Sequence, residues 1–252
     1  MGEGVARFVL TDAPLDVAGG DATGGEAEEL EKASGADART DGVSRDANRT
    51  WIEVVLPYLV DGGLLGTFVD WRGLPVFHAS AAALGLTPLD LVVWAKAKAG
   101  VGSLYPSQHE LLPLFKKGSA AHVNNLSKGK RGRHRTNLWT YPDISSPGPG
   151  AQKNDGDQGS EKPVAMLEGA LIDLTNRGDI VLDPFLGTGA TLIAADKAGR
   201  VCRGIEIDPR FVDVIIRRYE AITREAAILA DSGEPFATLA ARRRNDGGSL
   251  IS

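Results

Sequence analysis

The sequence has 252 residues, of which 42% are hydrophobic, with a formal net charge of −5 and a single cysteine. This length can bury the core of one medium-sized domain. One cysteine excludes a disulfide framework and a cysteine-rich zinc site, and the four scattered histidines lack metal-ligand spacing, so we expect no metal.

Neither a leader nor a membrane span is predicted. No charged segment followed by an apolar run opens the chain, and the most apolar long window, residues 75–94, contains Asp90, Gly85 and two prolines. We therefore expect a cytoplasmic protein without a membrane partner.

The first predicted element is a strand over Ala6–Thr11, which runs into Asp12, Ala13, Pro14 and Leu15. The residues that follow, 16–48, include few large apolar side chains, and residues 21–46 hold eight acids against three bases. Such a segment cannot bury much surface, which predicts a flexible loop.

Helical and strand patterns then alternate along the chain. Trp71, Trp94 and Trp139 are predicted to be core anchors. We predict strands over 64–69, 89–94, 110–115, 180–182 and 201–205, with 89–94 and 110–115 paired at a sheet edge, and helices over 51–59, 76–84 and 164–176, a helix ending at Gly199, and one over 209–228.

Two stretches are irregular and one is strongly basic. Residues 142–159 are rich in Ser, Pro, Gly and Asp, which predicts a linker or surface loop, and residues 231–252 are predicted to be a disordered tail. Residues 116–135 hold seven bases and no acids, and glycines interrupt the basic run. Such a run suits a loop that follows phosphates, although a merely solvated loop would have the same composition.

A glycine turn near residue 187 carries the most informative pattern. The strand over 180–182 ends in Asp183, and Gly187 and Gly189 precede a helix, so backbone N–H groups can approach a ligand. Seventeen residues after Gly189, the next strand ends at Glu206, a spacing suited to a carboxylate that binds ribose hydroxyls. The pattern predicts a nucleoside site, with a plain helix-packing turn as the alternative.

The nucleoside is not expected to be a dinucleotide. Leu192 stands where a dinucleotide fingerprint needs a small residue, and no Gly-Lys-Ser/Thr of a phosphate loop follows.

The stretch Leu182–Ala195 resembles the cofactor motif of amino-group DNA methyltransferases, the adenine-N6 and cytosine-N4 family that uses S-adenosylmethionine. Ser160 and Lys162-Pro163 resemble the end of the family's His-Pro-Thr-x-Lys-Pro motif. The order of catalytic tetrapeptide, recognition region and cofactor motif is that of the permuted β class. Further stretches similar to family members are 68–72, 93–96, 102–105, 109–110, 135–139, 205–209 and 211–212.

The resemblance implies an α/β, Rossmann-like S-adenosylmethionine-dependent methyltransferase fold: a mostly parallel sheet with helices on both faces. It implies a permuted domain over 1–223 with a target-recognition region over about 116–159, and double-stranded DNA as partner. The implied cofactor-binding residues are Ser160, Lys162, Asp183, Phe185, Gly187, Gly189, Thr191 and Glu206, and the implied DNA-binding residues are Lys128, Lys130, Arg131, Arg133 and Arg135.

The catalytic tetrapeptide departs from the family pattern Asp/Asn/Ser-Pro-Pro-aromatic. Asp12 and Pro14 match, whereas Ala13 replaces a proline and Leu15 replaces the aromatic residue. Ala13 leaves a floppier loop, and the lost stacking surface is worth about 1–3 kcal/mol. The carboxylate of Asp12 and the carbonyl of Ala13 would accept hydrogens from the target amine, while Pro14 and Leu15 wall the base.

These residues leave three functions open. The first is a methyltransferase acting on the amino group of adenine, or of cytosine, in DNA. The second is a catalytically impaired or inactive paralogue that binds the cofactor or DNA in a regulatory role. The third is a methyltransferase for RNA or protein amines.

Overall fold

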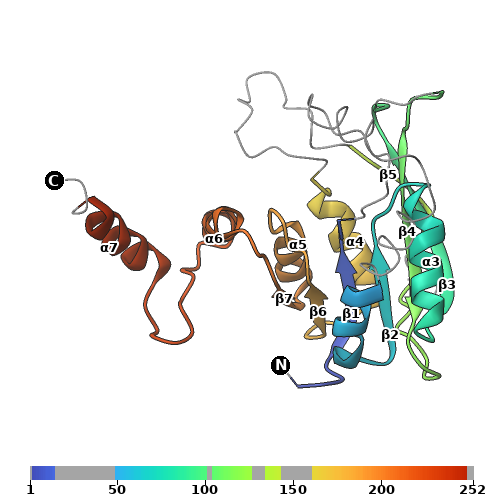
Figure 1. The fold of residues 1–252 in the computed structure, drawn as a ribbon, viewed down its shortest axis with the longest axis horizontal. Helices are drawn as coiled ribbons and strands as arrows, with labels where there is room; N and C mark the ends of the chain where they lie inside the picture. The colour runs from blue at the N-terminus through green and yellow to red at the C-terminus, as the bar shows by residue number, and fades with distance from the viewer. Residues whose placement is uncertain (1, 15–48, 101–103, 127–133, 143–160, 249–252) are drawn as a thin grey trace, which may run out of the picture.

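The computed structural model describes residues 2–14, 49–100, 104–126, 134–142 and 161–248. Within these residues, one seven-stranded sheet has the order β5-β3-β4-β2-β1-β6-β7 (Figure 1). All neighbouring strands are parallel except where β4 pairs antiparallel with β2 and β3. The strands are β1 Ala6–Thr11, β2 Leu59–Thr67, β3 Thr87–Lys96, β4 His109–Lys116, β5 Leu138–Tyr141, β6 Ile180–Asp183 and β7 Val201–Gly204.

Helices cover both faces of this sheet, as expected for the α/β class. On β1, Phe8 and Leu10 point to one face and Val9 to the other, and all three are fully buried. The first face packs under α4 (Val164–Leu174) and α5 (Ala190–Ala198). The second packs under a helix at residues 49–55 and α3 (Gly73–Ala83). A strand apolar on both sides is stable only between two such layers.

Two strands differ from the sequence-based expectation. β2 begins at Leu59, directly after the 3-10 turn η1 (Leu56–Tyr58), because Gly62 continues the strand with a φ of 75° instead of ending a helix. β5 was not predicted: its four residues belong to the expected recognition region, yet they pair in parallel with β3. β3 and β4 do pair as predicted, but β4 lies inside the sheet and β5 forms its edge.

The C-terminal part of the chain corrects the predicted disordered tail. Helix α6 (Pro209–Thr223) is followed by α7 (Phe236–Gly248), which lies furthest from the sheet (Figure 1). Pro235 stands just before α7, and the Phe236 ring lies 5.7 Å from the Arg217 guanidinium of α6. A proline at the start and an Ala/Arg/Leu composition favour a helix, which outweighs the missing apolar period.

The predicted anchors separate into two groups. Trp94 and Trp139 are 1% and 7% exposed, as expected of core residues, whereas Trp71 is 64% exposed, so its prediction as a core anchor was wrong. Trp71 lies in a turn between β2 and α3, where most of its side chain is exposed. No helix among the described residues is long and apolar enough to cross a membrane. The predicted loop 16–48 and residues 143–160 lie outside the described residues.

Candidate active site

The parallel strands β1, β6 and β7 have their carboxyl ends on the same side of the sheet, and an acidic residue lies at or just after each of these ends. Asp12 follows β1, Asp183 ends β6, and Glu206 comes shortly after β7. The hydroxyl of Thr11 donates a hydrogen bond to Oδ1 of Asp183 at 2.6 Å, across 172 residues of sequence. The end of β1, where Asp12 lies, is therefore next to Asp183 and the glycine turn that follows it, as the sequence predicted.

Asp183 is the most enclosed of these acids, with 2% of its surface exposed. Burial raises its pKa to about 6, against hydrogen bonds donated by Thr11, Thr191 and the Phe185 backbone N–H, which lower it. A buried carboxylate with three donors orients the turn rather than reacting itself. Its neighbours Phe185 and Thr191 are thus part of the turn's internal support.

The glycine turn leaves room for a ligand. Gly187 and Gly189 have φ values of 55° and 83°, which favour glycine. A Cβ at Gly187 would meet no atom within 4 Å, whereas one at Gly189 would lie 3.0 Å from Ile215. The turn is open on the Gly187 side and packed against α6 on the other.

Glu206 closes the turn from β7. Its Oε2 accepts a hydrogen bond from the Gly187 N–H at 2.8 Å, and Oε1 accepts one from the Asp208 N–H at 2.9 Å. Each carboxylate oxygen has two lone pairs, so both can still accept a hydroxyl. An open glycine turn with an acid of this kind suits the ribose of a nucleoside.

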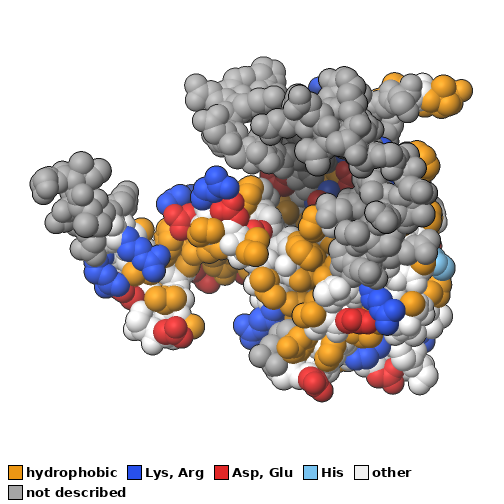
Figure 2. Space-filling view, in the orientation of Figure 1, with side chains coloured by type: hydrophobic (Ala, Val, Ile, Leu, Met, Phe, Trp, Pro, Cys, Tyr) orange, Lys and Arg blue, Asp and Glu red, His pale blue; other side chains and the backbone are white. Residues whose placement is uncertain are grey.

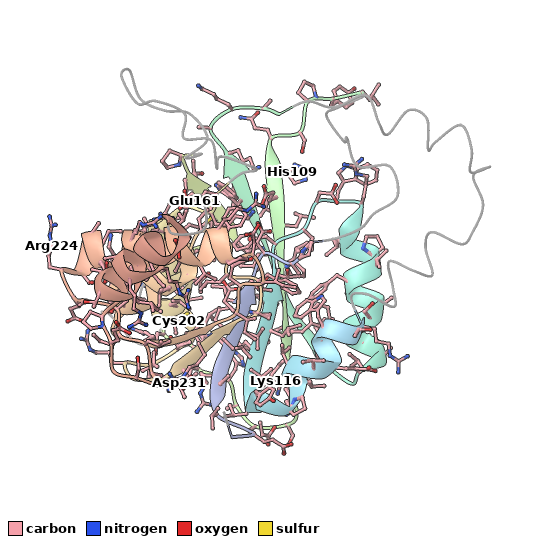
Figure 3. All side chains as sticks on the ribbon, turned by 60° about the vertical axis from the view of Figure 1, so that its left-hand side comes forward. His109, Lys116, Glu161, Cys202, Arg224 and Asp231 are labelled. Carbon is pink, nitrogen blue, oxygen red and sulfur yellow. The ribbon has the colours of Figure 1, made fainter. Side chains whose placement is uncertain are left out.

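Asp12, just after β1, forms an ion pair with Lys162. The Lys162 ammonium lies 2.6 Å from Oδ2 of Asp12 and 3.1 Å from Oε2 of Glu110 on β4, and it lies 5.2 Å from the centre of the Phe68 ring. Lys96 of β3 pairs with the other Glu110 oxygen. Figure 3 shows His109 and Glu161, the chain neighbours of Glu110 and Lys162, towards the same end of the sheet.

These contacts set the charge of the pair. Crowding by protein atoms raises the pKa of Asp12, although 48% of its side chain stays exposed, and the Lys162 ammonium lowers it in opposition. Burial lowers the pKa of Lys162, but the carboxylates of Asp12 and Glu110 outweigh this and raise it above its usual value. Lys162 is therefore a stable cation that faces two acids.

Ala13 is fixed by a contact that proline could not make. Its N–H donates to the Thr67 hydroxyl on β2 at 3.2 Å, and the residue is 5% exposed. The expectation of a floppier loop stays a prediction, to which the structure adds a buried partner for the N–H that proline would lack. Pro14 is exposed, and Leu15 lies outside the described residues.

One of the five predicted DNA-binding residues lies among the described residues, and the other four do not. The guanidinium of Arg135 lies 2.6 Å from Asp173 of α4, donates to the Tyr141 hydroxyl and stacks 4.5 Å from the Trp139 ring, so it joins β5 to the domain instead of facing solvent. Lys117 donates to two backbone carbonyls. Lys128, Lys130, Arg131 and Arg133, like Ser160 of the cofactor set, lie outside the described residues.

The basic composition of 116–135 therefore does not mark a single surface. Lys116 lies at the opposite end of β4 from His109 (Figure 3), and therefore also from Glu110, which shares Lys162 with Asp12.

Three residues of the site escaped prediction. The polar links around Asp12 are made by Thr11, Thr67 and Glu110. Of these, only Glu110 lies in one of the stretches that are similar to family members. Cys202, labelled in Figure 3, is half-buried, and burial raises the pKa of its thiol to about 12, in keeping with a packing role. Within the described ranges, no group of three or more His, Cys, Asp or Glu side chains could hold a metal.

Comparisons with known proteins agree with this architecture. Residues 31–217 match the family model for DNA methylases. The type II methyltransferase M.ScaI of Streptomyces caespitosus is 31% identical over 112 residues, which cover 43% of this chain and 34% of that protein. For the first three curated relatives the matched share of the relative is 34 to 58%.

Two solved structures share the fold. TTHA0409 of Thermus thermophilus, solved with S-adenosyl-L-methionine, has a TM-score of 0.62 at 22% identity, with 88% of each chain covered. The cytosine-N4-specific PvuII DNA methyltransferase has a TM-score of 0.64 at 15% identity, covering 86% of this chain and 80% of that one. With its family match extending over most of its length, this chain belongs to the DNA methylase family.

Proposed function

We propose that this chain transfers a methyl group from S-adenosylmethionine to the exocyclic amino group of adenine, or of cytosine, in double-stranded DNA. The observation that carries the proposal is the hydrogen bond from Thr11 to Asp183, which holds the acid after β1 beside the glycine turn after β6. A reaction between two bound molecules needs this kind of fixed approach.

Asp12 is the group that prepares the amine. The lone pair of an exocyclic amine is delocalised into its base, which makes the nitrogen a poor nucleophile. A carboxylate and a backbone carbonyl that accept its two hydrogens favour a more tetrahedral nitrogen. When the nitrogen gains the methyl group it must lose one proton, and the Asp12 carboxylate would accept it. The Thr67 contact keeps the Ala13 backbone, and hence its carbonyl, in place.

The cofactor residues fit a nucleoside with a charged tail. S-adenosylmethionine, when bound, supplies a methyl group on a positively charged sulfur. Glu206 would accept the ribose hydroxyls, and the open side of Gly187 leaves space beside it. Asp183, Phe185, Gly189 and Thr191 would shape the turn. Lys162, which resembles a cofactor contact in sequence, is held against Asp12, so we assign it to the amine side.

Tritiated methyl transfer to DNA tests the proposal. Purified protein is incubated with [methyl-³H]S-adenosylmethionine and duplex DNA, and methylated positions are read by sequencing. Asp12→Asn, which removes the acceptor charge with almost the same shape, is expected to lower transfer at least about a hundredfold. Glu53→Gln serves as the matched control, because Glu53 pairs with Arg49 on an exposed helix surface.

The outcomes separate the functions. Transfer to duplex DNA that Asp12→Asn abolishes supports the proposal. Cofactor binding by calorimetry without any methylated base would instead indicate a binding paralogue. Transfer to RNA or peptide but not to DNA would overturn the assignment of the substrate.

A further inference from the structure

A chain of four alternating charges leads from the interior of the sheet to Asp12. Lys96 on β3 pairs with Glu110 on β4, Glu110 pairs with Lys162, and Lys162 pairs with Asp12. The side chains of Lys96, Glu110 and Lys162 are 16%, 17% and 9% exposed, whereas that of Asp12, the last of the four charges, is 48% exposed.

The two carboxylates that contact Lys162 differ in their distance from it and in how they are held. The ammonium is closer to Asp12, at 2.6 Å, than to Glu110, at 3.1 Å. Glu110 is bound from both sides, one oxygen to each lysine, on a strand inside the sheet. Asp12 lies on a loop. Glu110, held between two lysines on a strand inside the sheet, is therefore the fixed partner of Lys162, and Asp12 is the solvent-exposed one.

We propose that Glu110 is a positioning residue for methyl transfer, which anchors the Lys162 ammonium beside Asp12 and is itself anchored by Lys96. This inference rests on the proposed function of Asp12. Lys162 occupies the place on Asp12 where an N–H group of the target amine would donate, and Glu110 gives the ammonium a second acceptor when the amine arrives.

The electrostatics explain why an anchor is needed. A lone ammonium beside Asp12 would pair with it fully and block the amine, whereas without the ammonium the crowded carboxylate would tend to take up a proton. An ammonium shared between two acids opposes the rise that burial gives the pKa of Asp12, while it binds Asp12 less completely. The Phe68 ring, 5.2 Å from the ammonium, adds a further favourable contact that leaves both acids in place.

The test compares loss of charge with loss of length. Glu110→Gln keeps the shape but not the charge, and Glu110→Asp keeps the charge on a shorter side chain. We expect Glu110→Gln to lower kcat about ten- to a hundredfold, with the Kd for S-adenosylmethionine changed less than about threefold, because Glu110 is not part of the glycine turn. Glu110→Asp should retain several-fold more activity than Glu110→Gln.

A merely structural Glu110 gives the opposite order. The isosteric glutamine would then behave like wild type, and the shorter aspartate would be the weaker enzyme. That result, or a loss of cofactor affinity equal to the loss of kcat, would overturn the proposal. Unfolding midpoints of both variants are measured alongside, with Glu53→Gln as the exposed control.

A second readout does not depend on turnover. In protein labelled with [¹⁵N]lysine, ammonium protons held by two carboxylates exchange slowly with water and give a visible NMR signal. We expect the Lys162 signal, assigned by its absence in Lys162→Arg, in wild type and Glu110→Asp but not in Glu110→Gln. An unchanged signal in Glu110→Gln contradicts the anchor even if the chain methylates DNA. A lost signal in a chain that methylates nothing keeps the anchor and refutes only the proposed function.

Discussion

The two flanks of β6 are built in opposite ways. Towards β1 and β2, buried polar links join successive strands: Thr11 to Asp183, and Ala13 to Thr67. Towards β7 the surface is apolar and open, with Ile205 and Ile207 59% and 95% exposed. Among the described residues, Glu206 is held there by the backbone N–H groups of Gly187 and Asp208. The ends of β1, β2 and β6 are thus linked to one another through buried contacts, whereas Glu206 is held by backbone groups of the glycine turn and of its own loop.

The open flank continues through the C-terminal helices. Among the described side chains of α6 only Ile215 is buried, while Val214 and Ile222 are exposed on the same helix. Figure 2 shows hydrophobic side chains interspersed with basic and acidic ones along the arm formed by α6 and α7. A helix with so little buried surface adds little to global stability. Unfolding measurements should therefore distinguish the two flanks.

The largest loss of stability from one substitution is expected at one of two glycines with the same backbone conformation. Gly62 in β2 and Gly233 between α6 and α7 have φ values of 75° and 72°. A Cβ at Gly62 would lie 2.7 Å from the Ala121 carbonyl oxygen, but one at Gly233 would meet nothing within 4 Å. Gly62→Ala should cost on the order of 3 kcal/mol of unfolding free energy, and Gly233→Ala about 1 kcal/mol. Equal losses in denaturant unfolding would contradict this account.

Asp183 should make stability depend on pH in a defined window. Its pKa is about 6 in the fold against 3.8 in the unfolded chain. Between these values the native state keeps a proton that the unfolded state has lost, so stability falls as pH rises from about 4 to 6 and is constant beyond. Compared with Asp183→Asn, wild type should lose about 3 kcal/mol across this range. Denaturant unfolding at several pH values measures the difference, and parallel curves for the two proteins would refute it.

The link between β1 and β6 should contribute more than a similar link on α6. Thr11→Val removes a donor from a buried carboxylate and should cost about 1–3 kcal/mol. Thr223→Val, the control, removes a hydroxyl that donates to the Tyr219 carbonyl near the end of α6 and should cost well under about 1 kcal/mol. Both are read from chemical denaturation, and a larger loss for Thr223→Val would reverse the comparison.

The smallest effect is expected from removing α7. Its described side chains reach α6 through the stacking of Arg217 on Phe236, and its own ion pair joins Arg242 to Glu234 at the surface. Exposed pairs of this kind contribute about 0–1 kcal/mol. A chain ended after Gly233 should keep the unfolding midpoint of the full chain within about 3 °C. A larger fall in a thermal scan would show that α7 supports the sheet.

The sequence predicted the fold where periodicity and topology decide. The apolar run Ala6–Thr11, the glycine turn at 187–189 and the acids at strand ends all lie where the pattern indicated. It did not predict the polar links, because they join residues far apart in sequence: Thr67 and Ala13 are 54 residues apart, and no local pattern indicates that they pair. The same limit explains Arg135, whose basic neighbours suggested DNA but whose partner Asp173 lies on a distant helix. Composition cannot show such pairings.

The Ala13 contact has a practical consequence for recognising relatives of this chain. Searches that require two consecutive prolines after the acid would discard it, although the Thr67 hydroxyl on the adjacent strand accepts a hydrogen bond from Ala13 that a proline could not donate. Where a hydroxyl on the neighbouring strand accepts a hydrogen bond from a non-proline residue at this place, the four residues after the first strand do not by themselves describe how the backbone is held.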